Sequence, residues 1–590
     1  MEDHEKGREA FADDESYRLH SLRHSTAHVM AEAIAKVFPG AQFGIGPSIE
    51  DGFDYDVDVP RPITEGDLET IEAEMKAIVK RNSPFTRKEV SREEAASVFT
   101  GQTYKQELIA GLEGALTTYE QGGFTDLCRG PHVPRTGNCK HFKLMRVSGA
   151  YWRGDATRPQ LQRVYGTVWP TREALDQYLF RLEEAKKRDH RKLGRELGLF
   201  MMHEYAPGAV FWLPRGEVLY HALSEAMRTQ LLADGYVAVR TPMVFDKGLW
   251  ETSGHWAHYR DNMFRIEKHE EGDEHARTYS LKPMNCPTHM LVFGNAKRSY
   301  RELPMRIHDQ GVLHRDEVRG ALGGLTRVRQ FCQDDAHLFV MESQIEDEVR
   351  KLIGLINRIY GAFDLGYKAK LSTRPVDKLG DDALWDAAEG ALKTALEGNG
   401  LSYTVNDGDG AFYGPKIDFD VVDALGRSWQ CATIQLDYQL PRRFELSYVG
   451  SDNTLHTPVV IHRAIFGSFE RFIGILIEHF AGNFPMWMAP EQVRVLTISE
   501  KSEAWATEVH AALRAAGVRA ELDIGSDKIG AKIAEAHASR PFYMVVIGEK
   551  EQEARMVNVR GRGENNRLGS FTLEEFVARC VAEGTAPFGA

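Results

Sequence analysis

The sequence predicts an α+β protein of several domains, and three observations support this fold class. With 590 residues the chain is too long for one hydrophobic core, and the usual domain size suggests roughly three to five units. Strand-like runs such as SWQCATIQLDYQL lie between helical stretches in residues 199–490, which is typical of an antiparallel sheet with helices packed on it. In residues 491–590 strands and helices alternate, which indicates a small α/β domain.

Composition and charge narrow the class of protein. Hydrophobic residues make up 42% and charged residues 27% of the chain, close to the averages of globular proteins. The net charge of -13 argues against a protein that coats nucleic acid nonspecifically, because such proteins carry a basic excess. The 6 cysteines are scattered, which favours thiols or metal ligands over disulfides. Because no signal peptide or membrane-length apolar run is visible, we expect a cytoplasmic protein.

The first domain is expected over residues 21–180, after an N-terminal extension of residues 1–20. It contains His24 and His28, four residues apart in a segment with helical periodicity, so both imidazoles would share one helix face. Cys128 and His132 repeat this spacing downstream. These residue types suit a zinc site or a metal-free hydrolytic pocket, and spacing alone also allows unrelated histidines. A metalloprotease of the H-E-x-x-H type is excluded, because Ser25 stands where that motif requires glutamate.

A charged stretch, FRLEEAKKRDHRKLGRELGLF, follows the first domain. It has high helical propensity and few core residues, so we expect a linker helix over residues 181–198. Its basic side chains would contact phosphate or simply be solvated, and the sequence leaves both interpretations open.

The central domain is expected over residues 199–490, and its candidate metal ligands are Cys286, His337 and His462. Three ligands of this kind suit zinc and leave a fourth position for substrate. They are far apart in the sequence, so spacing equally allows a buried cysteine and two ordinary histidines. Near the end of the domain, apolar residues recur at helical spacing from Phe469 to Phe480, and Arg471 lies off this apolar stripe.

Arginines beside the strand-like runs form a further candidate set. Arg315, Arg327 and Arg471 are suited to clamping a triphosphate, with Glu317 close by in the sequence. No P-loop and no dinucleotide fingerprint is present to serve that role. If ATP binds, arginines on an antiparallel sheet must hold it. The segment FPMWMAPEQ then interrupts all periodicity and predicts a boundary before the last domain.

Together these segments resemble the class II aminoacyl-tRNA synthetases and, within them, the threonyl-tRNA synthetase family. YHALSEAMRTQLLADGYVAVRTPMV is similar to motif 1, which commonly forms the dimer interface. RIHDQGVLHRDEVRGALGGLTRVRQF is similar to motif 2, and HRAIFGSFERFIGILIEHF to motif 3. The small ubiquitin-like N-terminal domain of many members is expected to be missing, because His24 lies too close to the start.

The resemblance implies roles for the central residues. Arg315 would contact the α-phosphate of ATP, Glu317 the adenine and Arg471 the γ-phosphate, with Arg327 at the same nucleotide. Cys286, His337 and His462 are implied as ligands of one zinc ion per subunit, which would hold the amino group and hydroxyl of threonine and so reject valine. The positions that match the lining of the threonine pocket are Gln333, Asp335, Tyr413, Lys416 and Gln435.

The resemblance also implies an editing function for residues 21–180. Serine lacks only a methyl group of threonine, worth about 1 to 3 kcal/mol of discrimination, so a hydrolytic second site is needed. The matched editing positions are His24, His28, Lys105, Asp126, Cys128 and His132, taken as a metal-free site for Ser-tRNA. In the C-terminal domain, Glu551 and Arg560 match positions expected to contact the anticodon.

The implied activity is the two-step joining of L-threonine to tRNA(Thr), with Mg-ATP as the co-substrate and a homodimer formed through motif 1. A non-catalytic RNA-binding relative should have lost the metal or arginine positions, which are all present here. A relative specific for proline or serine is disfavoured by the Cys-His-His set. Two departures from the family pattern stand out: Thr288 replaces a glycine beside Cys286, where we expect reduced loop freedom, and Ser526 replaces an asparagine.

Overall fold

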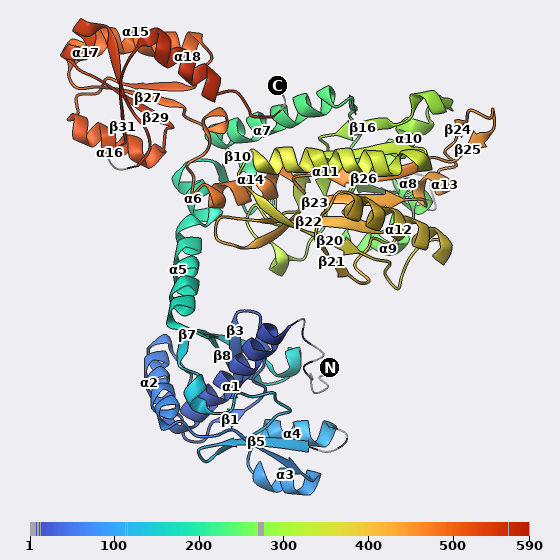
Figure 1. Cartoon of the computed structure of the whole chain (residues 1–590), viewed down its shortest axis with the longest axis vertical. Helices are drawn as coiled ribbons and strands as arrows, with labels where there is room; N and C mark the ends of the chain where they lie inside the picture. The colour runs from blue at the N-terminus through green and yellow to red at the C-terminus, as the bar shows by residue number, and fades with distance from the viewer. Residues whose placement is uncertain are drawn as a thin grey trace. The chain divides into compact units, whose positions relative to one another are not determined.

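The computed structural model describes residues 8, 11, 13–112, 114, 116–268, 277–563 and 566–588 (Figure 1). The chain forms two compact units, Met1–Glu183 and Glu184–Ala590, each with most of its residue contacts inside itself. Among the described residues, no helix is both long enough and apolar enough to cross a membrane. The expected N-terminal extension lies partly outside the described residues, and from Asp14 onward its residues belong to the first helix.

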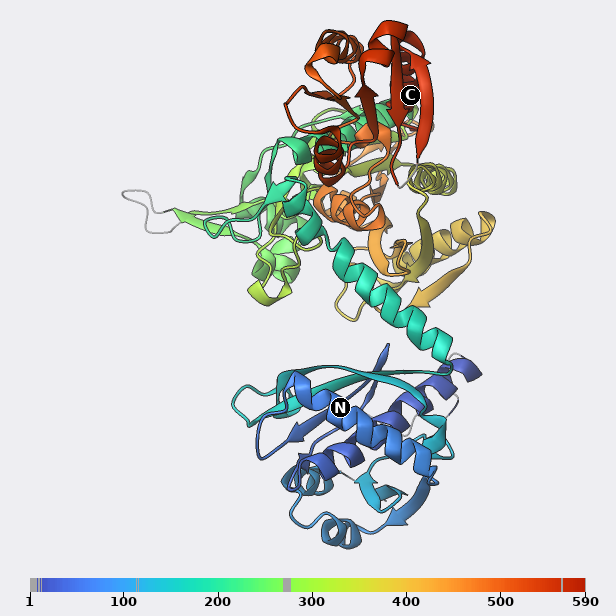
Figure 2. The same cartoon turned by 90° about the vertical axis from the view of Figure 1, so that its left-hand side faces the viewer.

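The first unit contains a sheet covered by two helices. Helix α1 (Asp14–Val37) is capped by Asp13, whose side chain accepts a hydrogen bond from the Ser16 amide, and α2 (Glu65–Arg81) begins with a capping box. Both helices pack against the sheet through one apolar core (Figure 2). The strands, in sheet order, are β1 (Gln42–Phe43), β3 (Gly52–Asp58), β8 (Gln160–Trp169) and β7 (His141–Tyr151), with β2 (Ser48–Ile49) also paired to β3.

A second, three-stranded sheet completes this unit. Its strands are β4 (Thr86–Val90), β5 (Leu116–Gln121) and β6 (Phe124–Leu127), and the helices beside it are α3 (Arg92–Val98) and α4 (Thr103–Gly111). Strand β6 carries Asp126 and ends directly before Cys128. Helix α4 carries Lys105. These two elements therefore bring residues from later in this unit to the histidines of α1.

The single linker helix expected over residues 181–198 is two helices. Helix α5 (Arg172–Arg188) begins earlier than expected, and α6 (His190–Glu196) follows it. Asp189 separates them with φ -47 and ψ 120, and its carboxylate accepts a 2.8 Å hydrogen bond from the Arg191 amide. An aspartate that caps the next helix in this way ends the preceding one.

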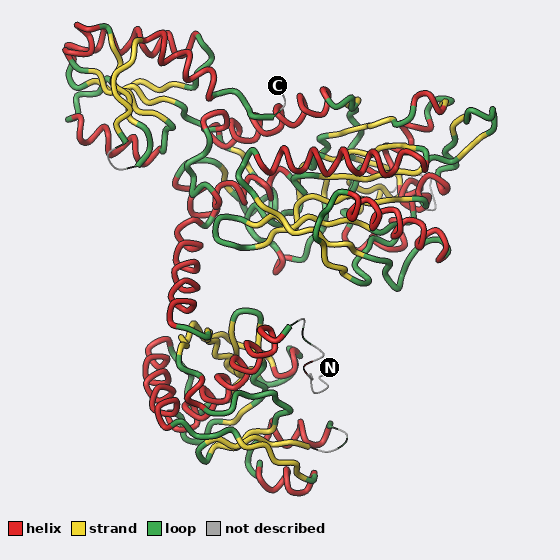
Figure 3. Tube along the Cα trace, viewed as in Figure 1, coloured by secondary structure: helices red, strands yellow, loops and turns green. Residues whose placement is uncertain are grey.

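The second unit is built on the expected antiparallel sheet with helices packed on it (Figure 3). In the described part of this sheet, only the two edge strands pair in parallel with their neighbours. In sheet order the strands are β11 (Val237–Ala238), β16 (Met305–Asp309), β19 (Asp335–Val340), β26 (Val459–Ala464), β23 (Ser428–Asp437), β22 (Lys416–Val422), β20 (Gly366–Ser372) and β21 (Tyr403–Asn406). The helices that contribute to its main core include α6, α7 (Pro214–Ala233), α11 (Ile345–Gly361), α12 (Asp382–Gly398) and α14 (Phe469–His479).

The last domain has strands alternating with helices, as expected, but its sheet is mixed. Strands β28 (Ala520–Asp523), β27 (Val493–Thr497) and β29 (Tyr543–Ile547) are parallel, whereas β30 (Met556–Arg560) runs antiparallel to both of its neighbours, β29 and β31 (Arg567–Thr572). The connection between β30 and β31 is too short for a crossover, which forces a hairpin. In the described residues, α15 (Glu503–Ala515) and α18 (Leu573–Glu583) share one core, and α16 (Ile529–Ser539) contributes to another.

Candidate functional site

The alternation of side chains along the strands separates the core from the candidate site in the second unit. Leu338, Ile461 and Leu436 belong to the core beneath the helices. His337 and His462 are their neighbours in sequence and therefore point to the opposite face of the sheet. The strands β19 and β26 pair in a register that places these two histidines directly opposite each other. The sheet thus presents an apolar face to the helices and a polar face to the site.

The structure brings Cys286, His337 and His462 together although they are distant in the sequence. One ligand atom from each lies within 4.8 Å of the others, and all three residues are buried. Cys286 is the first residue of α10 (Cys286–Gly294). A thiolate and two imidazoles form a donor set that suits zinc.

The free ring nitrogens fit a metal at this position. His337 Nε2 and His462 Nδ1 are buried without a hydrogen-bond partner. The other nitrogen of each ring is engaged: His462 Nε2 lies 2.9 Å from an Asp437 carboxylate oxygen, and His337 Nδ1 lies 2.7 Å from His289 Nδ1. Metal-binding histidines are commonly held by such outer partners, with the second nitrogen left for the ion.

Electrostatics agree with this assignment. Burial lowers the pKa of His337 well below its ordinary value, so the ring is neutral, as a metal ligand must be. Burial also lowers the pKa of His462, but the nearby Cys286 and Asp437 outweigh it and raise the pKa to about 10. A cation at the centre of the three residues would take the place of that proton.

A cavity of about 500 Å³ opens beside the three residues. Its lining includes Cys286 and His462 together with the candidate nucleotide residues Arg315, Glu317, Arg327 and Arg471. The candidate threonine residues Gln333, Asp335, Tyr413 and Gln435 line it as well. Two candidates are not in the lining. His337 is fully buried, and Lys416 pairs with Asp418 at 2.9 Å and Asp409 at 3.2 Å.

The arginines are already held in place by the protein. Arg471 donates to the carbonyl oxygens of Thr326 and Gln430 at 3.0 and 2.9 Å. Burial lowers its pKa, and the nearby charges of Arg315 and Arg327 lower it further. Several guanidinium groups at one cavity favour an anion with several charges, such as a triphosphate. Arg327 also donates two hydrogen bonds to Glu317, at 3.1 and 2.8 Å.

The remaining candidates at this cavity are mostly satisfied by hydrogen bonds. Gln333 donates to the Gly467 carbonyl oxygen at 2.8 Å, and Gln435 donates to the Gly414 carbonyl oxygen at 3.0 Å. Asp335 accepts from Asn285 at 3.1 Å, and burial raises its pKa to about 7. A cationic group entering here would convert this carboxyl to its charged form.

Thr288 is part of helix α10 and not of a loop, which corrects the expectation of reduced loop freedom. Its hydroxyl donates to the Asn285 carbonyl oxygen at 2.7 Å. Glycine is not needed at a helical position, because its advantage is confined to backbone conformations that other residues avoid. The backbone here does not require the family glycine.

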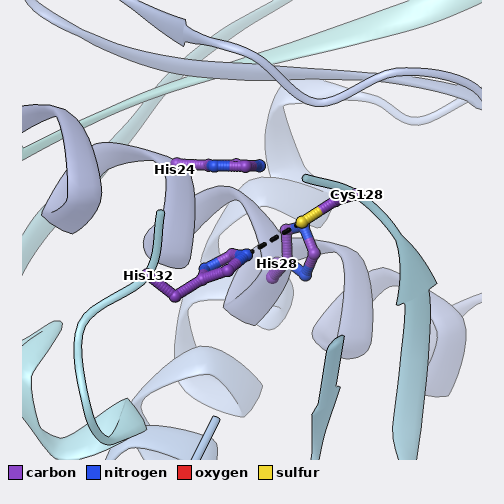
Figure 4. Close-up of side chains that lie close together, drawn as sticks. All are labelled: His24, His28, Cys128 and His132. Atoms are coloured by element: carbon purple, nitrogen blue, oxygen red, sulfur yellow. Dashed lines mark hydrogen bonds between the residues drawn. The ribbon is translucent and has the colours of Figure 1, made fainter. Parts of the chain in front are cut away.

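The first unit gathers the four residues of the two spaced pairs into one cluster (Figure 4). His24 and His28 come from α1, and their rings lie 4.4 and 4.5 Å from the ring of His132. Cys128 Sγ lies 3.0 Å from His132 Nε2. One ligand atom of each residue lies within 4.8 Å of the others, a geometry that a metal site and a metal-free pocket share.

Hydrogen bonds fix the proton positions at His132. The Ser25 hydroxyl donates to the Ser21 carbonyl oxygen at 2.7 Å and accepts from the Val133 amide at 2.9 Å. Because its single proton is already donated to Ser21, this hydroxyl can only accept the 3.0 Å hydrogen bond from His132 Nδ1. His132 Nε2 is then the acceptor that faces the Cys128 thiol, whose pKa is raised by burial. The ring therefore has a basic nitrogen inside the cluster.

Lys105 and Asp126 form a buried pair beside the histidines. Lys105 Nζ lies 2.5 Å from one Asp126 carboxylate oxygen and donates to the Tyr55 hydroxyl at 3.0 Å. The other carboxylate oxygen lies 3.5 Å from His28 Nε2 and accepts from Tyr55. Asp126 therefore connects the ammonium group to the imidazole cluster, an arrangement suited to acid–base chemistry.

Acid is expected to destabilise the chain through this cluster. Burial lowers the pKa of His24 from 6.5 to about 4 and the pKa values of His28 and His132 well below their ordinary value. The unfolded chain then binds more protons below pH 6.5, so the free energy of unfolding falls between about pH 6.5 and 4, by at most about 1.4 kcal/mol per pH unit for each histidine. Urea unfolding across this range measures the slope. A His28→Gln variant should show a shallower slope, and an unchanged slope would assign the effect to other groups.

The anticodon candidates lie in the last domain. Glu551 accepts from the Gly548 amide at 3.0 Å and so caps α17 (Glu549–Ala554). Arg560 ends strand β30, and its Nε is buried without a hydrogen-bond partner. Because Glu551 already has a structural hydrogen bond, contact with RNA would use its remaining oxygen.

Some residues of both sites were missed by sequence reasoning. Asp437 lies two positions after Gln435 on one strand and thus on the same face, and His289 lies three positions after Cys286 on one helix face. These spacings could have identified both as neighbours of the candidate metal ligands. Tyr55 carried no comparable signal, because only the tertiary fold brings it to Asp126.

Three family models match the chain. Residues 264–480 match the "tRNA synthetase class II core domain (G, H, P, S and T)", and residues 492–583 match the "Anticodon binding domain". Residues 116–165 match the "Threonyl and Alanyl tRNA synthetase second additional domain". The antiparallel sheet with its arginine-lined cavity is thus that of a class II aminoacyl-tRNA synthetase.

Similar whole proteins narrow this class. The chain is 53% identical to "Threonine--tRNA ligase" of Anaeromyxobacter dehalogenans, over 97% of this chain and 89% of that protein, and 51% identical to that of Myxococcus xanthus, over 96% and 89%. The chain belongs to the threonine--tRNA ligase family. A crystal structure of the RNA binding domain of threonyl-tRNA synthetase from Cryptosporidium parvum is 43% identical and has a TM-score of 0.65, covering 67% of this chain and 98% of that one.

Proposed function

We propose that the chain activates L-threonine with ATP and transfers it to tRNA(Thr). The observation that carries this proposal is the position of the Cys286, His337 and His462 cluster at the same cavity as Arg315 and Arg471. A threonine carboxylate oxygen would attack the α-phosphate and release pyrophosphate, and a ribose hydroxyl of the terminal adenosine of tRNA would then attack the carbonyl carbon of the adenylate, take the threonyl group and release AMP. The arginines would stabilise phosphate charge, and use of ATP implies Mg²⁺.

We further propose zinc as the ion held by Cys286, His337 and His462. The partnerless nitrogens His337 Nε2 and His462 Nδ1 support this fit. When bound, zinc would supply a Lewis acid for the amino group and hydroxyl of threonine. The protein's own part would be to orient the substrate: Asp335 and Gln435 line the cavity next to His462 and offer polar groups to the amino acid.

ATP–pyrophosphate exchange over a panel of amino acids tests the activity. Threonine should support exchange, serine weakly, and valine and proline at background, because only threonine and serine carry both a hydroxyl and an amino group in the required positions. Exchange with proline alone would replace this proposal by another specificity, and no exchange with any amino acid would favour a non-catalytic RNA-binding protein.

We propose that the cluster of the first unit hydrolyses Ser-tRNA(Thr) without a metal. A metal-free site is supported by the hydrogen bonds of His132, whose two ring nitrogens are engaged by Ser25 and Cys128. The neutral His132 would accept a proton from water, and Lys105 would stabilise the developing charge on the ester oxygen. His24 and His28 would shape the pocket.

Replacing His132 by Ala should separate editing from synthesis. Threonine activation is expected to be unchanged, while hydrolysis of Ser-tRNA(Thr) should fall by about a hundredfold, the usual size of a lost general base. Deacylation of preformed Ser-tRNA(Thr) measures the loss. His141→Ala serves as a control in the same unit, because His141 begins β7 and is not part of the cluster. Equal deacylation by wild type and His132→Ala would remove this residue from editing.

The domain bounds and the homodimer also remain proposals. We assign editing to residues 21–180, synthesis to 199–490 and anticodon binding, with Glu551 and Arg560, to 491–590. A homodimer through motif 1 is supported by large apolar side chains on that segment, since Val237, Met243 and Val244 are 48–49% exposed. Large apolar side chains exposed close together on one segment are typical of surfaces that bind another protein chain.

A further inference from the structure

The first residue of α6, His190, is buried and fully hydrogen bonded inside the second unit. Its Nδ1 lies 2.6 Å from a Glu478 carboxylate oxygen near the end of α14, and the His190 amide donates to the same oxygen at 3.0 Å. Its Nε2 accepts a 3.0 Å hydrogen bond from the Leu325 amide. The ring therefore joins three segments that are far apart in the sequence.

The Leu325 amide determines the proton positions of the ring. A backbone amide can only donate, so Nε2 is the unprotonated nitrogen and Nδ1 carries the proton given to Glu478. Asp189, His190 and Glu478 have the spacing of a metal site, but both ring nitrogens are already used. The histidine thus acts as a bridge, donating to one side and accepting from the other.

Through its accepting nitrogen, Nε2, His190 holds the loop that carries Thr326 and Arg327. Leu325 is fully buried, and Gly324 lies so close that an added Cβ would meet His190 Nε2 at 2.2 Å. The next residue, Thr326, receives a 3.0 Å hydrogen bond on its carbonyl oxygen from Arg471 Nε. The loop is therefore fixed from the ring on one side and from Arg471 on the other.

Through its donating nitrogen, Nδ1, His190 is hydrogen bonded to α14, the helix that carries Arg471. Glu478 and Arg471 both belong to α14, and the second Glu478 oxygen lies 2.5 Å from Arg427. Because Glu478 is buried and paired, it gives His190 a fixed partner. The loop with Thr326 and Arg327 and the helix α14 with Arg471 both line the cavity beside Cys286. The imidazole of His190 connects this loop to this helix.

We propose that His190 is a positioning residue for the ATP side of the cavity. It holds Leu325 so that the Thr326 carbonyl orients Arg471 and Arg327 faces the nucleotide. This inference rests on the proposed ATP-dependent activity. It does not involve threonine, since the residues assigned to the amino acid have no contact with the ring among the described hydrogen bonds.

Two conservative variants separate the two sides of the bridge. In His190→Gln the amide oxygen reaches the place of Nε2 and can accept from Leu325. In His190→Asn the shorter amide reaches the place of Nδ1 and can donate to Glu478, but leaves the Leu325 amide without an acceptor. His190→Phe removes both hydrogen bonds and keeps the ring. ATP–pyrophosphate exchange at varied ATP and at varied threonine measures each variant in the full chain.

The Asn and Phe variants should raise KM for ATP about tenfold, the order expected when a buried amide loses its acceptor. KM for threonine and zinc content should stay at the wild-type value, and the Gln variant should recover most of the ATP affinity. Hydrogen exchange at the Leu325 amide should be faster in Asn than in Gln, independently of activity. If the Phe variant does not fold, the Gln and Asn pair decides alone.

Three results would overturn the inference: equal KM for ATP in Asn, Gln and wild type, equal exchange rates at Leu325 in these proteins, or a parallel rise of both KM values. The wild-type enzyme is the control for the underlying activity. Absence of exchange in the wild type would count against the proposed function, whereas an active wild type with indifferent variants would count only against the role of His190.

Discussion

A Cys286→Ser variant should contain no zinc and should not activate threonine. Cys286 is one of the three residues proposed to hold zinc, which the described structure brings together at this site, and a serine hydroxyl is a poor replacement because it stays protonated. Loss of a Lewis acid that supplies several kcal/mol corresponds to at least about a thousandfold lower exchange. Metal analysis of the purified protein and ATP–pyrophosphate exchange with threonine measure both effects.

Cys431→Ser provides the matched control. Cys431 is buried and lines the same cavity, but it is not in the three-residue cluster. This variant should keep its zinc and most of its activity. Zinc and activity retained in Cys286→Ser would contradict the ligand assignment, and zinc lost from both variants would show that any cysteine substitution at this cavity disturbs the site.

Removing the guanidinium of Arg471 should cost about a hundredfold to a thousandfold in kcat for threonine activation, the size found for a preorganised group that stabilises transition-state charge. Arg471 lines the cavity, and its hydrogen bonds to Thr326 and Gln430 hold it in place before substrate binds. Exchange kinetics of Arg471→Ala at varied ATP give the loss in kcat and in kcat/KM.

The matched variant is Arg471→Lys. It keeps the positive charge but cannot donate to both carbonyl oxygens and to a phosphate at once, because the ammonium group lacks the planar fork of arginine. It should fall between the wild type and the Ala variant. If the Ala variant has wild-type kinetics for ATP, Arg471 does not contact the nucleotide.

Local patterns were enough to predict part of the fold and of the sites. The spacing of His24 and His28 predicts one shared helix face, and α1 places both rings beside His132. The apolar stripe from Phe469 onward likewise predicts α14, with Arg471 free to reach the cavity. In each case the relevant geometry is set within a few turns of one helix, which the sequence encodes directly.

Other features depend on contacts that sequence spacing does not encode. Cys286, His337 and His462 meet because of the pairing register of β19 with β26 and the position of α10, so from spacing alone they were indistinguishable from unrelated residues. The break at Asp189 was missed because the segment around it has uniformly high helical propensity. The mixed sheet of the last domain was missed because alternation of strands and helices does not reveal strand direction.

The break between α5 and α6 at Asp189 has a practical consequence for experiments on a fragment that lacks the first unit. A fragment chosen from the sequence pattern would start near residue 199, where the charged linker stretch ends. Such a fragment would omit His190 and expose the carboxylate of Glu478 and the amide of Leu325, both of which the ring now covers. Fragments intended for inhibitor screening or nucleotide titration should therefore start upstream of Asp189, so that weak ATP binding is not mistaken for a property of the intact enzyme.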